Sequence, residues 1–147
     1  MELPVVSAAA FGPNGTGDGD NPQLAGAVLT NPASGWMTDW YASAEFGSLK
    51  QGTGLLLDMG KNVTISSVQV RLGTATGASI ELLTGTQPTM SAFRVAAARQ
   101  GVGGLVTLTP DRSVMTRYVL LWFTKLPLDG NGTYQASVHQ VAVKGQP

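Results

Sequence analysis

Short segments in which apolar and polar residues alternate follow one another along most of the chain. Residues 68–72 read Val, Gln, Val, Arg, Leu, and the same period of two residues recurs in 79–82, 93–97 and 106–109. This period is typical of strands that bury one face. Tyr118–Thr124 is apolar almost throughout, which predicts a central strand covered on both faces. With turn residues between the segments, the pattern predicts about eight strands and an all-β sandwich.

The two ends of the chain complete this architecture. Residues 4–11 predict a first strand, and Asn21–Pro22 predicts the start of a short helix, with asparagine as its N-cap and proline in its first position. In the last strand, 138–143, the spacing of the valines changes from three to two, which predicts a bulge after Val138. We therefore expect an all-β sandwich with one short helix near the N-terminus. The expected inward-facing side chains are those of Trp36, Leu56, Val68, Val70, Val119, Leu121, Val141 and Val143.

Composition excludes several classes of protein. The chain has 147 residues, enough for one domain (1–147, with its core at about 5–145), and no cysteine, so it has no disulfide, thiolate zinc site or cysteine nucleophile. Its one histidine, His139, lies in a predicted strand, and no nucleotide-binding or hydrolase motif is present. We therefore expect no catalytic activity. Nine basic residues balance nine acidic ones, which argues against a nucleic-acid partner.

Four motifs in a fixed order suggest a more specific fold. They are Trp36–Thr38, Gly54–Gly60, Ser67–Val70 and Val138–Gly145. Together they resemble the discoidin, or coagulation-factor type C, class of galactose-binding-like domains over about residues 5–145. The resemblance implies a jelly-roll sandwich.

A second set of motifs is narrower. It consists of Phe11-Gly12-Pro13, Asn21-Pro22, Trp36-x-Thr38-x-x-Tyr41, the segment Phe46–Asp58, which begins Phe-Gly-x-Leu-Lys, and Arg117–Pro127. This set is similar to the C-terminal domain of actinobacterial MviN (MurJ-type) proteins. It implies a non-catalytic, extracytoplasmic, monomeric domain of a lipid II flippase at the outer face of the plasma membrane. Such a domain would bind cell-wall glycan or a partner protein and would meet the membrane only through its parent chain. The alternative is a carbohydrate-binding module of a secreted enzyme or adhesin.

The discoidin resemblance also concerns calcium. Many such domains hold a calcium ion between the turn before the tryptophan and the last strand, but Leu29, Ser34 and Gln140 stand here where the family has Asp, Thr and Glu. Calcium prefers several oxygen ligands with carboxylates among them, so we expect no ion there and no cofactor.

A different loop offers a weak candidate for a metal site. Asp18 and Asp20 flank one glycine, and two carboxylates at this spacing can converge on a hard cation. The alternative is a solvated turn that caps the helix start at Asn21.

Two aromatic-bearing segments are the candidates for ligand binding. Sugar sites combine an apolar ring with a few polar groups, and such groups occur in Trp40 and Tyr41 and in the loop that holds Asp129, Asn131 and Tyr134. We predict a site at the loop end of the sandwich built from these five residues. The prediction requires that the two loops are neighbours.

Overall fold

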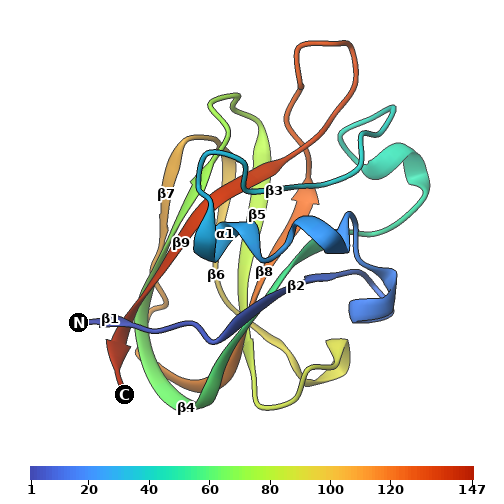
Figure 1. The fold of residues 1–147 in the computed structure, drawn as a ribbon. Coiled ribbons are helices and arrows are strands. Elements are labelled where there is room, and N and C mark those ends of the chain that lie inside the picture. Colours follow the sequence, from blue (N-terminus) through green and yellow to red (C-terminus); the bar gives the residue numbers. More distant parts are fainter.

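The computed structural model describes residues 1–147, which form nine antiparallel strands and five short helices (Figure 1). The strands are β1 (Glu2–Leu3), β2 (Ser7–Phe11), β3 (Trp36–Met37), β4 (Thr53–Leu72), β5 (Ala78–Gly85), β6 (Arg94–Val102), β7 (Leu105–Leu108), β8 (Val114–Lys125) and β9 (Ser137–Gln146). The helices are η1 (Thr16–Asp18), η2 (Pro22–Leu24), α1 (Ala27–Thr30), η3 (Phe46–Ser48) and η4 (Met90–Ala92). None of them has the length and apolarity needed to cross a membrane.

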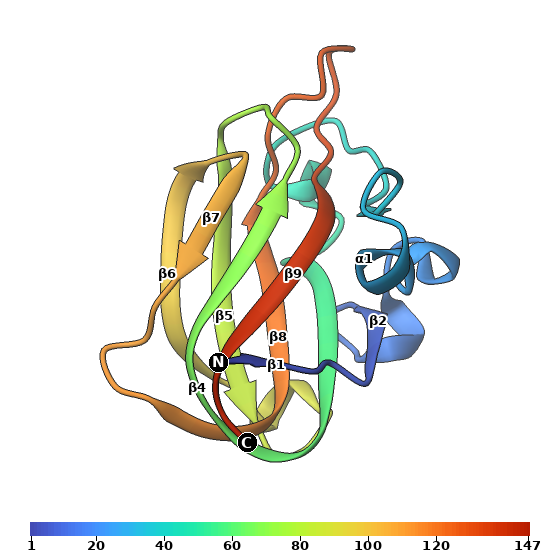
Figure 2. The same ribbon diagram turned by 60° about the vertical axis from the view of Figure 1, so that its left-hand side comes forward.

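The long strand β4 belongs to both layers of the sandwich (Figure 2). Its first half, 53–58, pairs with β2 and β8, and its second half, 64–72, pairs with β9 and β7. The strand bends where Gly60 has a φ of 82° and the register with β8 shifts. The pattern of apolar residues predicted a strand at 68–72 but did not show that this strand continues from the segment 54–60, because the pattern reports alternation and not continuity.

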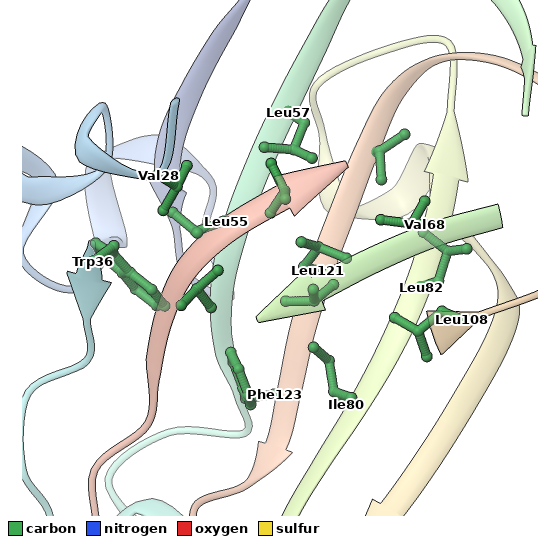
Figure 3. Close-up of a cluster of buried hydrophobic side chains, with 14 of the residues drawn as sticks. Val28, Trp36, Leu55, Leu57, Val68, Ile80, Leu82, Leu108, Leu121 and Phe123 are labelled. Carbon is green, nitrogen blue, oxygen red and sulfur yellow. The ribbon is translucent and has the colours of Figure 1, made fainter. Parts of the chain in front are cut away.

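The larger core lies between the two layers (Figure 3). All eight side chains that were expected to face inward are buried, and Trp36 is fully covered. Seven of them belong to this core, whereas Leu56 lies in a smaller cluster with Phe11, Leu83, Phe93, Leu120 and Trp122. Side chains alternate across a strand, so Leu55 and Leu57 occupy the inner face and Leu56 points outward.

The prediction of a central, doubly covered strand is confirmed by β8. It pairs with β4 on one side and β5 on the other. Val119 and Leu121 pack into the larger core, and Leu120 and Trp122 pack into the smaller cluster.

Strand β9 contains the expected bulge. Arg71 of β4 lies opposite Gln140, but the next residue, Leu72, lies opposite Val138. His139 is therefore the extra residue, and its Nδ1 lies 3.0 Å from the carbonyl oxygen of Pro32.

The two termini lie close together, away from the loops that are described next. β1 pairs with β9, and the backbone N–H of Gly145 donates to the carbonyl oxygen of Met1 at 2.9 Å. Figure 2 shows both ends on the lower part of the sandwich.

Candidate functional site

Three loops gather at the upper end of the sandwich in Figure 1, and we call them the apical loops. They comprise residues 38–44 after β3, 73–77 after β4 and 127–136 before β9. Connecting segments on a rigid scaffold commonly carry binding residues. The candidate site is therefore built here.

Backbone hydrogen bonds join the first and third apical loops. The amides of Tyr41 and Tyr134 donate to each other's carbonyl oxygens at 2.8 and 2.9 Å, and the amide of Thr38 donates to the carbonyl of Ala136 at 2.9 Å. The Gln135 side-chain amide adds a bond of 2.7 Å to the carbonyl of Thr38. The two loops that the sequence analysis required to be neighbours are neighbours.

A hollow of about 290 Å³ opens between these loops, and we call it the Trp40 hollow. It is lined by Trp40, Asp129, Asn131, Thr133 and Gln135. The side chain of Trp40 is 66% exposed, which is unusual for so large an apolar group. The hollow therefore offers one free aromatic face beside several polar side chains.

The carboxylate of Asp129 is held in place by its own loop. One of its oxygens accepts a hydrogen bond from the Thr133 hydroxyl. The other accepts a hydrogen bond of 2.8 Å from the backbone N–H of Asn131. The hydroxyl of Thr133 and then the amide of Asn131 hold the pKa of this carboxyl below its usual range. Gly130 and Gly132, with φ of 90° and 82°, provide the turn that folds the loop around it. Asp129 is thus an oriented, ionised group at neutral pH.

A second hollow of about 240 Å³ adjoins the first, and we call it the Leu128 hollow. It shares Asp129 and Gln135 with the Trp40 hollow. Its apolar side chains include Met37 and Leu128, which are 37% and 53% exposed. The two hollows together make up the candidate site.

The two predicted tyrosines do not line either hollow. Tyr41 is only 5% exposed, and its ring packs edge-on against Phe46 at a centroid distance of 5.2 Å. Tyr134 is half-buried against the larger core. Their part is to join the loops through their backbones, whereas Trp40, Asp129 and Asn131 reach the hollow.

Sequence reasoning missed most of the lining residues of the two hollows. Among them are Met37, Leu128, Thr133 and Gln135. Thr133 and Gln135 are polar residues of the same loop as Asn131, and their polarity within a predicted binding loop was a usable signal. The exposed apolar pair of Met37 and Leu128 carried no such signal.

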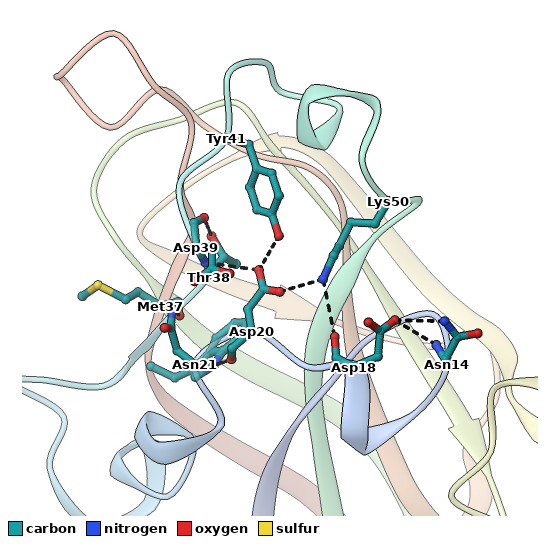
Figure 4. Close-up of polar contacts among 10 residues, drawn as sticks. Asn14, Asp18, Asp20, Asn21, Met37, Thr38, Asp39, Tyr41 and Lys50 are labelled. Carbon is teal, nitrogen blue, oxygen red and sulfur yellow. Dashed lines mark hydrogen bonds and ion pairs between the residues drawn. The ribbon is translucent and has the colours of Figure 1, made fainter.

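Asp20 lies beneath the first apical loop at the centre of a buried polar cluster (Figure 4). Its carboxylate accepts hydrogen bonds from the Lys50 ammonium at 2.8 Å, the Tyr41 hydroxyl at 2.8 Å and the Asp39 amide at 3.1 Å. Its carbonyl oxygen accepts from the Trp36 indole at 2.8 Å. Burial and the Asp20 carboxylate together raise the pKa of Tyr41. The interpretation of residues 18–21 as a solvated turn is wrong, because the buried carboxylate of Asp20 ties the loop that carries Trp40 to the core.

Asp18 and Asp20 do not present a free pair of carboxylates. The carboxylate of Asp18 accepts from the backbone amide of Asn14 at 3.2 Å, and both oxygens of Asp20 are occupied by the donors described above. The Lys50 ammonium already occupies the position of a cation beside Asp20. These residues do not fit a calcium ion.

The family's calcium position has no carboxylate at the three predicted residues. Leu29, Ser34 and Gln140 are all at the surface. No group of three or more acidic or histidine side chains that could hold a metal occurs anywhere in the chain.

Several solved structures share this fold. A CBM32 domain of AlyQ in complex with 4,5-unsaturated mannuronic acid has a TM-score of 0.66 at 15% identity, over 98% of both chains. A chitosan-binding module from a chitosanase/glucanase of Paenibacillus sp. IK-5 has a TM-score of 0.66 at 15% identity, over 97% of this chain and 96% of that one. A CBM32 domain of Clostridium perfringens in complex with GalNAc-β-1,3-galactose has a TM-score of 0.63 at 16% identity, over 97% and 99%.

These likenesses define the class of fold. The chain is a β-sandwich with the fold of CBM32 domains such as these. The predicted fold is confirmed. No protein-family model matches the sequence, and no curated protein sequence is significantly similar to it.

Proposed function

We propose that this protein is a non-catalytic carbohydrate-binding domain that holds glycan in the Trp40 hollow. The observation that carries the proposal is the exposed Trp40 ring on the wall of a hollow whose other side chains are Asp129, Asn131, Thr133 and Gln135. A mostly apolar platform with a few oriented polar groups is the usual design of a small-molecule site.

The chemistry of these side chains suits a sugar. The flat indole face of Trp40 can cover the C–H face of a pyranose ring, and burying that surface stabilises the complex. The Asp129 carboxylate accepts hydrogen bonds from hydroxyl groups, and the Asn131 and Gln135 side chains offer both donors and acceptors. Together they fix the orientation of a ring that stacking alone would leave free to rotate.

The comparisons support the same class of ligand. Two of the structures that share the fold were solved with sugars bound, and a third is described as a chitosan-binding module. The chain also aligns with 34% of a truncated AlyQ chain that has CBM32 and alginate lyase domains. A carbohydrate-binding module of a larger protein is therefore favoured over an enzyme in its own right.

Calorimetric titration with a panel of oligosaccharides tests the proposal. We expect at least one glycan to bind to the wild type and to lose about fivefold in affinity in Trp40→Ala, because an aromatic contact contributes on the order of 1 kcal/mol. Met115→Ala is the matched control, since Met115 is 69% exposed at the opposite end of β8. Equal affinities in the wild type and Trp40→Ala would contradict the proposal.

The identity of the parent chain is a separate proposal. The flippase hypothesis rests on the narrower motif match alone, and none of the comparisons supports it. Several of those motif residues, among them Trp36, Tyr41 and Lys50, meet at Asp20 rather than at the hollow. If the domain is extracytoplasmic and serves cell-wall synthesis, a GlcNAc-MurNAc disaccharide should be the preferred glycan in the same titration. Preference for a plant or algal polysaccharide would contradict that context.

A further inference from the structure

The charges around the two hollows are all of one sign. The apical loops, 38–44, 73–77 and 127–136, contain two carboxylates, those of Asp39 and Asp129, and no lysine or arginine. Lys125, which precedes the third loop, lies 3.9 Å from the carboxylate of Glu45 and lines neither hollow. A ligand at this end therefore meets negative charge that no cationic side chain within the site offsets.

Asp129 is the charged residue that such a ligand would touch. It is the only formally charged side chain that lines either hollow, and it lines both. A sugar chain that occupies one hollow or bridges the two therefore lies beside the same carboxylate.

The hydrogen bonds within the loop leave this carboxylate able to bind. Each of its oxygens accepts one bond, from Thr133 or from Asn131, and a carboxylate has about four acceptor positions in all. The bonds from its own loop orient the group in advance, so that little ordering remains when a ligand arrives. A cationic donor on the ligand would form the stronger, charge-assisted kind of hydrogen bond.

We infer that the site selects sugars by charge: it binds a glycan with free amino groups, of the glucosamine type, more tightly than the N-acetylated form, and it rejects uronic acids. The inference rests on the proposed function, because it concerns the same hollow. An ammonium group gains the attraction of Asp129, whereas a uronate brings a second negative charge to a site with no cation. The shared scaffold leaves this choice to the loops, since proteins with this fold were solved with a mannuronic acid unit and with GalNAc-β-1,3-galactose.

Titration of three hexamers against the wild type tests the inference. The ligands are a glucosamine hexamer, its N-acetylated counterpart and a galacturonate hexamer, each at 50 and 200 mM salt. We expect the glucosamine hexamer to bind about tenfold more tightly than the N-acetylated one at low salt, with a smaller ratio at high salt. We expect no binding of the galacturonate hexamer.

Two variants assign the selectivity to Asp129. Asp129→Asn should bring the ratio of the two affinities close to one, because it should weaken binding of the glucosamine hexamer far more than binding of the N-acetylated hexamer. Asp111→Asn removes a surface carboxylate near the start of β8, and it should leave the ratio intact. Circular dichroism spectra and melting temperatures check that both variants fold.

The outcomes separate the two proposals. If the N-acetylated hexamer binds through Trp40 but the glucosamine hexamer binds no better, the inference on charge fails and the proposed function stands. A ratio that Asp129→Asn leaves unchanged, or tight binding of the galacturonate hexamer, also overturns the inference alone. If no glycan binds to the wild type, both proposals fail.

Discussion

Tyr41 and Tyr134 exchange two backbone hydrogen bonds, of 2.8 and 2.9 Å, although they come from opposite ends of the sequence. This pairing brings Trp40, which precedes Tyr41, into one hollow with Asp129 and Asn131. The rings of the two tyrosines serve the scaffold, and their neighbours in the chain form the site. The burial of Asp20 under the same loop completes the support.

Asp20→Asn should destabilise the protein by about 3 kcal/mol, the low end of the range for breaking a buried ion pair. The substitution leaves the Lys50 ammonium, only 18% of whose side chain is exposed, without its carboxylate. Urea denaturation measures the loss. Asp18→Asn is the control, because its carboxylate contacts only Asn14 at the surface, and a change within about 0.5 kcal/mol is expected. Equal losses in the two variants would show that the Asp20 cluster contributes nothing special.

Tyr41 should make the stability of the protein depend on alkaline pH. The pKa of its hydroxyl is raised in the folded state by burial and by Asp20, so above pH 10 the unfolded chain loses this proton while the folded chain keeps it. Stability present below the unfolded pKa of about 10 therefore falls as pH rises, with a slope of up to about 1.4 kcal/mol per pH unit.

The matched variant for this pH dependence is Tyr41→Phe, which lacks the hydroxyl. Other groups titrate in the same range, so the quantity to measure is the difference in free energy of unfolding between the wild type and Tyr41→Phe at pH 8 and pH 11. We expect that difference to shift in favour of Tyr41→Phe at the higher pH. An unchanged difference would contradict the role of the hydroxyl.

Two glycine substitutions should act in opposite directions. A Cβ at Gly54 would lie only 2.0 Å from the carbonyl oxygen of Leu121 across the β4–β8 pair, so Gly54→Ala should cost about 3 kcal/mol or more. A Cβ at Gly26 meets nothing within 4 Å, and its φ of −63° and ψ of −20° suit alanine. Gly26→Ala should stabilise the protein by about 0.5 kcal/mol, because it restricts the unfolded chain. Thermal melting of the two variants checks both signs.

Calcium should leave the melting temperature unchanged. Asp18 and Asp20 are engaged with protein donors, and Leu29 and Gln140 supply no carboxylate at the family's position. An ion that binds only the native state, present at 100 times its dissociation constant, would raise the free energy of unfolding by about 2.7 kcal/mol. Thermal melting with millimolar calcium and with a chelator detects a change of that size. If calcium raises the melting temperature of the wild type but not that of Asp20→Asn, the ion displaces Lys50 from Asp20.

The fold was predictable because a strand that buries one face alternates apolar and polar residues, and this alternation can be read from the sequence. The alternation in 68–72 and the continuous apolar run Tyr118–Thr124 both report which faces are covered, and both predictions are confirmed. Leu56 shows the limit of this signal: an apolar residue at the right spacing was expected in the larger core, but it packs on the other face of its strand. A pattern of apolar residues cannot tell two apolar faces apart.

The site was predictable only as two loops. Residue type drew attention to Trp40 and Asp129, which both line the Trp40 hollow, but it could not show that Tyr41, next in the chain, turns inward to a buried carboxylate. The burial of Asp20 depends on Lys50, thirty positions later in the sequence, and no local pattern reports that pairing. Met37 and Leu128 likewise line one hollow although they lie far apart in the sequence.

Because the two termini lie close together, attachment of the domain to a surface or to another chain through either end gives it the same orientation. Met1 and Gly145 are hydrogen-bonded to each other on the lower part of the sandwich, so a surface or a fused chain attached at either end leaves Trp40 facing outward. Many copies fixed in this way would present parallel hollows to one polymer. Each additional engaged copy would then bind at a high effective concentration, so even weak single-site affinity gives firm retention on a polysaccharide.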